Sequence, residues 1–159
     1  MIEDSPGSGI YNTTAAFHKR IGEMISEVVD DGVVVALEDL DSVLRAGGYP
    51  DPELVCIASP ELSFERDTND PGNVLLVMRF IIDIYVEQQR DLPTGQLPEP
   101  IERLYEILDD VLPVVVYSDV HGYQMIIDSA IPQSRSEMTQ KQYRIETTIE
   151  KQMDYSPCQ

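Results

Sequence analysis

Positive charge is scarce in this sequence. Its 159 residues include 11 lysines and arginines against 29 aspartates and glutamates. Lysine is nearly absent and occurs only as Lys19, Lys141 and Lys151. Proteins that hold a nucleic-acid backbone do so with clustered basic side chains, which neutralise the phosphates. The sequence therefore argues against direct binding to DNA or RNA.

Cysteine and long apolar runs are also scarce. The cysteines are Cys56, inside an apolar run, and Cys158, the second-last residue, a placement that fits neither a disulfide framework nor a zinc site. No stretch approaches the roughly 18 apolar residues that a membrane-spanning helix requires. The polar, acidic residues 1–9 also lack the basic start and apolar run of a signal peptide. We therefore expect no membrane partner, and a protein that stays in the cytoplasm or is built into something assembled there.

Acidic residues, by contrast, are abundant and are spread along the whole chain, which carries a formal net charge of -18. One block of like charge would indicate a disordered tail, whereas dispersed acid on a foldable pattern indicates a solvated surface. In dilute buffer such a surface repels itself and destabilises the folded state. At 1 M salt the Debye length is about 3 Å, so most of this repulsion disappears. The composition favours the salt-loaded cytoplasm of an extreme halophile; the alternative is an ordinary acidic protein.

Two segments have the periodicity of amphipathic helices. Apolar side chains recur every three or four residues over 13–29 and over 99–112. Asn12 or Thr13 is the expected N-cap of the first helix. Pro113 is expected to end the second helix, because proline disrupts a helix interior.

Alternating side chains predict a long strand over 74–88 and a half-exposed last strand over 142–154. His121-Gly122 is expected to form a turn. Shorter apolar runs predict one helical turn and five further strands. The turn is expected at 40–44, and the strands at 33–37, 54–58, 62–66, 114–118 and 125–131.

The order of these elements favours an α+β fold, in which two amphipathic helices pack on one face of a mostly antiparallel sheet. The length of the chain fits one domain. We place this domain at 12–154, between a flexible leader at 1–11 and a C-terminal tail at 155–159.

Catalytic groups do not converge in this sequence. Histidine is the usual general base, and the two histidines are His18, on the expected polar side of the first helix, and His121, in an expected turn. Neither has a serine or cysteine nucleophile implied nearby, so we expect no catalytic residue. The acidic run Glu38-Asp39-Leu40-Asp41 lacks the ligand spacing and the glycine of an EF-hand calcium loop. We therefore expect a non-enzymatic protein with no metal and no cofactor.

The order and the lengths of the elements resemble those of the tail terminator, or tail completion, proteins of long-tailed viruses. The resemblance covers residues 12–154 and rests on no signature motif. It is carried by six segments: the opening helix 13–29, the strand 33–37, the Tyr-Pro-Asp-Pro-Glu-Leu-Val passage 49–55, the long strand 78–86, the helix 100–112 and the closing strand 143–149.

The resemblance implies a structural virion protein that forms a ring, usually a hexamer. The ring caps the tail tube, ends its elongation and joins it to the neck beneath the capsid. The implied partners are further copies of this chain, the tail tube protein and a neck or connector protein. Combined with the acidic composition, the resemblance points to a virus of a halophilic archaeon, with the protein assembled in the host cytoplasm and carried in the virion.

Two long loops, 67–73 and 89–100, are the expected contacts with neighbouring subunits or with the tube, because long loops are often functional. The candidate contact residues are Arg66, Asp67, Asn69, Asp70, Arg90 and Leu92. DNA is expected to pass through the lumen of the ring without specific binding. The lumen should therefore be net negative, since like charge reduces adhesion to phosphates.

Three other classes of function stay open at the level of sequence. The first is another neck component, such as a head-closure protein or a connector. The second is a cellular binding module of a halophile, with a small-molecule pocket. The third is a small hydrolase that depends on His121.

Overall fold

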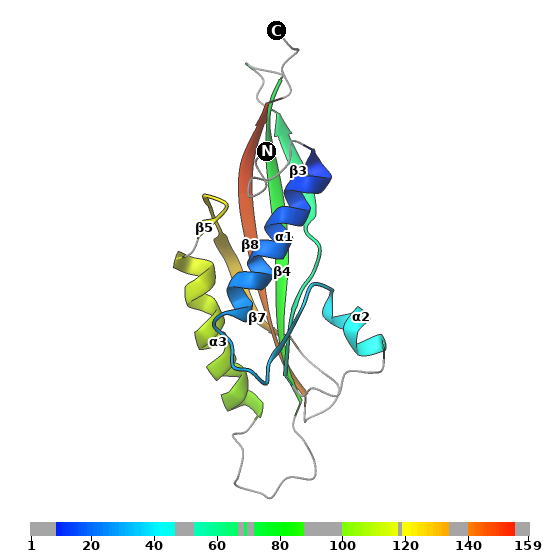
Figure 1. Ribbon diagram of the computed structural model, residues 1–159, viewed down its shortest axis with the longest axis vertical. Helices are drawn as coiled ribbons and strands as arrows, with labels where there is room; N and C mark the ends of the chain where they lie inside the picture. Colours follow the sequence, from blue (N-terminus) through cyan, green and yellow to red (C-terminus); the bar gives the residue numbers. More distant parts are fainter. Residues whose placement is uncertain are drawn as a thin grey trace, which may run out of the picture.

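The computed structural model describes residues 9–46, 53–66, 69, 72–87, 100–117, 119–133 and 140–154, and its elements are labelled in Figure 1. The helices are α1 (Ile10–Ser26), α2 (Leu40–Arg45) and α3 (Pro100–Tyr117). The strands are β1 (Val34–Ala36), β2 (Glu53–Ile57), β3 (Glu61–Arg66), β4 (Asn73–Glu87), β5 (Asp119–Val120), β6 (Tyr123–Gln124), β7 (Ile126–Gln133) and β8 (Gln140–Asp154).

Six strands form one sheet in the order β1-β2-β4-β8-β7, with β3 also pairing with β4. The long strands β4 and β8 pair antiparallel along their whole length, from Asn73 opposite Asp154 to Glu87 opposite Gln140. On the other side of β4, strand β2 pairs with its second half and β3 with its first half. Among the described strands, only β1 and β2 pair parallel. The predicted mixed α/β fold with a largely antiparallel sheet is confirmed.

The main hydrophobic core follows from the alternation of β4. Successive side chains of a strand point to opposite faces, and the even-numbered residues of β4 from Leu76 to Val86 are all buried in one cluster. Helix α1 contributes Phe17, Ile21 and Ile25 to the same cluster, and α3 contributes residues including Leu104, Val111 and Val115. Figure 1 shows α1 crossing in front of β4 and β8, and α3 lying beside β7.

A second, smaller cluster forms around α2. Leu40 and Val43 of this helix pack with Leu54, Cys56 and Tyr85, which belong to β2 and β4. The helix begins at a side-chain cap, in which the Ser42 backbone N–H donates to Asp39 Oδ2 at 3.1 Å. The sequence predicted only a single helical turn here. Packing against the apolar side chains of β2 and β4 accounts for the longer helix.

Helix α3 does not end at Pro113, and the strand predicted over 114–118 is wrong. The helix continues through the exposed Pro113 to Tyr117. Proline removes one hydrogen bond of the helix interior. Val115 is nevertheless buried in the main core beside Val111, one turn earlier. The apolar stripe of α3 therefore carries on across the proline, and its burial outweighs the local disruption.

Helix α1 begins at Ile10, three residues before its predicted start, and ends at Ser26. The predicted caps, Asn12 and Thr13, lie inside the helix, and Thr13 is buried. Gly9 is the residue at the N-cap, and it makes no side-chain hydrogen bond. The predicted N-cap is therefore wrong, because the packing of Thr13 extends the helix beyond the cap that local sequence favours.

The turn predicted at His121-Gly122 is confirmed. Strands β5 and β6 form a hairpin with these two residues between them. Both have positive φ, 50° for His121 and 84° for Gly122, as a two-residue hairpin of the tight, right-twisted kind requires.

Arg103 of α3 joins three parts of the fold. Its Nε and Nη2 atoms donate to the two carboxylate oxygens of Glu53 at 2.5 and 2.9 Å. Its Nη2 atom also lies 3.0 Å from Asp30 Oδ2, in the segment after α1. The hydrogen bond that Arg103 donates to Glu53 is the main reason that the pKa of the Arg103 guanidinium is raised. This bidentate pair connects α3 to β2 on the core side of the sheet.

Cys56 is a buried apolar residue, as the sequence predicted, with 1% of its surface exposed. Burial raises the pKa of its thiol to about 12, with the nearby Asp83 carboxylate adding to the effect. In a Cys158→Ser variant, we therefore expect Cys56 to resist a thiol reagent such as DTNB at neutral pH, because the thiolate is the reactive form. Guanidinium should release one reactive thiol per chain. Rapid labelling of the native variant would contradict this burial.

Within the described segments, no helix is both long enough and apolar enough to cross a membrane.

Candidate assembly surface

One face of the sheet is only partly covered. Helix α2 packs on this face over β1, β2 and the end of β4. Beyond α2, the face presents the odd-numbered residues of β4, including Val77, Arg79 and Ile81, together with the even-numbered residues of β8. We call this surface the open face. Where no described helix covers it, such a sheet face is a natural place for contact with another molecule.

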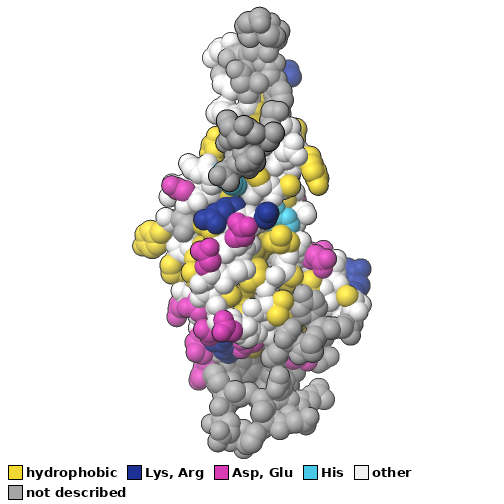
Figure 2. Space-filling model, viewed as in Figure 1, with side chains coloured by type: hydrophobic (Ala, Val, Ile, Leu, Met, Phe, Trp, Pro, Cys, Tyr) yellow, Lys and Arg dark blue, Asp and Glu magenta, His cyan; other side chains and the backbone are white. Residues whose placement is uncertain are grey.

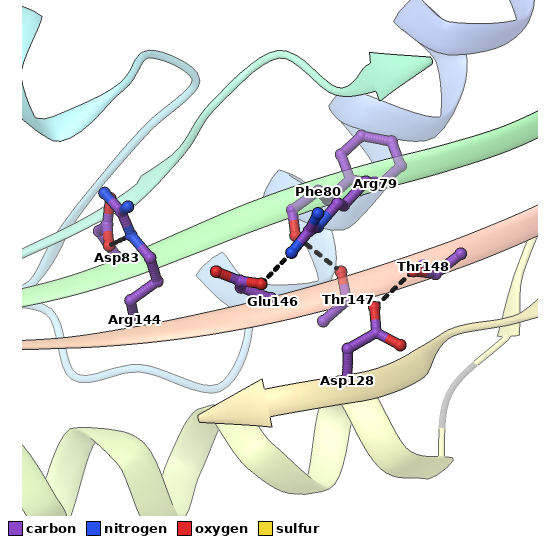
Figure 3. Close-up of polar contacts among 8 residues, drawn as sticks. All are labelled: Arg79, Phe80, Asp83, Asp128, Arg144, Glu146, Thr147 and Thr148. Atoms are coloured by element: carbon purple, nitrogen blue, oxygen red, sulfur yellow. Dashed lines mark hydrogen bonds and ion pairs between the residues drawn. The ribbon is translucent and has the colours of Figure 1, made fainter. Parts of the chain in front are cut away.

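Both arginines of the open face are held in ion pairs, as Figure 3 shows. Arg144 on β8 donates from Nε and Nη2 to the Asp83 carboxylate on β4, at 2.9 and 3.1 Å. Gln142 donates to the same carboxylate at 2.9 Å. Arg79 pairs with Glu146 across the same two strands. The open face therefore presents neutralised guanidinium groups, each with its pKa raised by the hydrogen bond to its carboxylate partner.

Asp83 is the buried member of this network, with only 2% of the residue exposed. A buried carboxylate is costly unless it is paired and hydrogen-bonded. Asp83 meets this need with three hydrogen bonds from Arg144 and Gln142. The network thus stabilises the pairing of β4 with β8 at the border of α2.

A shallow hollow of about 440 Å³ lies on the open face beside β3. Two acids, Glu61 and Asp128, contribute to its wall, and the Thr148 hydroxyl donates to Asp128 Oδ2. Arg79, also in the wall, is already paired with Glu146. The full lining consists of Glu61, Leu62, Ser63, Val77, Arg79, Asp128 and Thr148.

The edges of the sheet differ in how open they are. Strand β1 has only three residues. Strand β7 is interrupted by an irregularity between Ile127 and Ser129 and contains Pro132, which has no N–H to donate. Strand β3 has six consecutive residues, all exposed, and among the described strands it pairs only with β4. Short length, bulges and proline are devices that protect edges, and β3 has none of these three.

The predicted contact residues fall mostly outside what the structure describes. Arg66 ends β3, opposite Val74, and is exposed. Asn69 is also exposed. Asp67, Asp70, Arg90 and Leu92 lie outside the described residues. The strand predicted at 62–66 was not among the expected contact surfaces, although the alternation of Leu62 and Phe64 with polar neighbours indicates a strand with two different faces.

Both histidines make contacts that attach them to the fold. His18 is half-buried, not on a freely solvated helix surface, and its Nε2 atom lies 2.6 Å from the Ile57 carbonyl oxygen. The His121 Nε2 atom lies 3.3 Å from the Ala16 carbonyl oxygen, and its ring meets Phe17 edge-on at 5.3 Å between centroids. Over the described part of the chain, no group of three or more His, Cys, Asp or Glu side chains is placed to hold a metal ion.

A second hollow of about 550 Å³ lies between α1 and β1. The helix approaches the chain closely at Gly22, where an added Cβ would lie 2.6 Å from Leu37 Cδ2. Lys19, Arg20 and Glu23 bring charges of both signs to its wall. It contains neither histidine, so it does not assemble the groups that the hydrolase alternative requires.

Comparison with known proteins identifies a shared fold. The sequence matches no protein-family model and no curated protein. Among solved structures, the chain is similar to one chain of the virion of native gene transfer agent (GTA) particle, with a TM-score of 0.58 and 9% sequence identity. The match covers 87% of this chain and 96% of that chain. At this identity the similarity shows the fold alone.

Proposed function

We propose that this chain is a structural, non-enzymatic virion protein of a long-tailed virus, acting as a tail terminator. The observation that carries the proposal is the fold shared over nearly the full length of a chain from a virus-like particle. The order of elements resembles that of tail terminator proteins independently of this comparison. The protein would form a ring, a hexamer in the simplest case, that caps the tail tube and joins it to the neck.

In this proposal, the chain forms one domain, with α1 and α3 as the layer on one face of the sheet and the open face turned toward the lumen. The acids Glu61, Glu65 and Glu150 project from the open face in addition to the two neutralised arginines. A lumen lined by this face is therefore net negative even though it contains Arg79 and Arg144. DNA would pass through it without adhering, since like charge reduces contact with phosphates.

The partners of the ring are the tail tube protein and a neck or connector protein, and its location is the virion, after assembly in the host cytoplasm. The acid-rich surface supports a halophilic archaeon as the host. Figure 2 shows carboxylate side chains at several separate places on the side of the molecule that carries α1 and α3. This scatter fits a solvated surface adapted to salt better than one acidic binding patch.

The ring can be tested directly by measuring the mass of the full chain in molar KCl with light scattering, followed by electron microscopy. We expect a closed ring with about six times the 17.9 kDa mass of one chain, and rings at the head-proximal end of tail tubes in particles. An isolated monomer that is absent from virions would contradict the proposal. A ring located elsewhere in the neck would instead favour the head-closure or connector alternative.

A further inference from the structure

We propose that the outer edge of β3 accepts an extended segment of a neighbouring virion protein, which pairs with it as an added strand. The segment should alternate apolar residues with basic ones. This inference deepens the proposed function. It rests on that function for one point only, which is that the neighbour is a virion protein. The binding chemistry itself follows from β3 and its surroundings.

The backbone of β3 is open to an added strand. Its inner edge pairs with β4 from Glu61 opposite Arg79 to Arg66 opposite Val74. Among the described residues, no strand pairs with its outer edge. The unpaired N–H and C=O groups of an edge strand form a template for a further strand. A segment of six residues is long enough for such pairing to set a register.

The two faces of β3 set the side chains that the added strand needs. Leu62 and Phe64 lie on the helix side, opposite the buried Met78 and Leu76, yet are 38% and 50% exposed. An apolar side chain beside them on the added strand would bury this surface, since cross-strand neighbours pack against one another. The helix side of the added strand is therefore apolar.

The open-face side of β3 is acidic. Glu61 and Glu65 alternate there with Ser63. Glu61 also borders the hollow of about 440 Å³, whose other carboxylate is Asp128. Asp128 lies on β7, two strands beyond β4, so the carboxylates near an added strand are those of Glu61 and Glu65. Arg79, the arginine of the hollow, is paired with Glu146. A lysine or arginine of the added strand would lie directly across from the carboxylate of Glu61 or Glu65.

A second copy of this chain fits the β3 edge less well. Its other long edge, β7, carries an irregularity after Ile127 and also Pro132, which disrupt a continuous ladder of hydrogen bonds. Each copy also carries a formal charge of -18, so a second copy brings further acid to an acidic strand. Charge therefore favours a different, basic segment over self-pairing.

The test uses the full chain at the lowest salt concentration at which it remains folded. The probe is a synthetic eight-residue peptide of alternating valine and arginine. Its control is a peptide of the same composition in which the valines come first and the arginines follow. Amide hydrogen exchange by NMR reports where the peptide binds. We expect the alternating peptide to slow exchange at alternate amides of β3. The control peptide should leave the exchange rates of β3 unchanged.

Two variants with the same charge change separate β3 from the general acidity of the surface. Glu61→Lys reverses a charge on β3, whereas Glu150→Lys makes the same change at an exposed position of β8, away from the free edge. We expect Glu61→Lys to weaken binding of the alternating peptide about three- to tenfold, as reversal of a cross-strand charge pair implies. Glu150→Lys should leave binding within about twofold of the parent, because its charge is not cross-strand to the peptide.

Three results would overturn the inference. Equal weakening by Glu61→Lys and Glu150→Lys would show attraction to overall charge and not to β3. Protection located away from β3 would assign the peptide to another surface. Protection of the outward-pointing amides of β3 in the assembled full chain before any peptide is added would show that a second copy occupies this edge. None of these results depends on whether rings are seen on tail tubes, so failure here is distinct from failure of the tail terminator proposal.

Discussion

Lowering the salt concentration from about 1 M to about 0.1 M should abolish the cooperative thermal unfolding of this protein. The Debye length grows from about 3 Å to about 10 Å over this range, so neighbouring surface carboxylates begin to repel one another. The chain has 29 acidic and 11 basic residues, so its basic side chains are too few to neutralise its acids. Melts followed by circular dichroism across a salt series measure the effect.

A variant that reverses surface charge separates screening from other effects of salt. Glu27, Glu106 and Glu150 are exposed, and changing all three to lysine reduces the negative charge without touching the core. This variant should remain folded at lower salt than the parent, because less repulsion must be screened. A melting temperature of the parent that stays unchanged down to low salt would refute the halophile interpretation.

Replacing Phe80 by alanine should be severely destabilising even in molar salt. Phe80 is completely buried in the main core, and its ring lies 6.2 Å from that of His18 on α1. Truncation of a buried phenylalanine costs about 3–5 kcal/mol, a large part of the roughly 5–15 kcal/mol that stabilises a typical domain. For a domain of this size, the melting temperature should fall by roughly 10 °C.

Phe64→Ala is the matched control for this substitution. It removes the same side chain from a position that is half exposed on β3, so little buried surface is lost and no cavity forms. Its melting temperature should therefore lie close to that of the parent. Similar losses for the two variants would contradict the assignment of Phe80 to the core and of Phe64 to the surface.

Elements with a sustained period were predictable from local sequence. The alternation over 74–88 located β4 to within one residue at each end. The stripe of α3 was recognised too, but the rule that proline ends a helix prevailed over the apolar periodicity beyond it. The structure shows the opposite outcome because Val115 is buried in the core. A proline rule describes the cost of a local break, and it does not include the gain from tertiary burial.

The surface candidates were less predictable than the elements. Long polar loops supplied five of the six predicted contact residues, and the sixth, Arg66, ends β3, the strand whose outer edge is unpaired among the described strands. Its exposure depends on two strands sharing the partner β4, with β2 along one half and β3 along the other. This arrangement brings together residues that are far apart in the chain, so it cannot be predicted from any short stretch of the sequence.

The composition-dependent properties of this protein and the type of its longest elements follow from local sequence alone. Charge excess, the scarcity of lysine, the alternation of β4 and β8 and the apolar stripes of α1 and α3 are local, because each is a property of single residues or of one short window. The order of the strands, the burial of Asp83 and the unpaired outer edge of β3 among the described strands depend on tertiary contacts. Asp83 and Arg144 lie 61 positions apart in the chain, and their pairing exists only because β4 and β8 lie side by side. Packing between distant segments, which also overrode the proline in α3, sets these features.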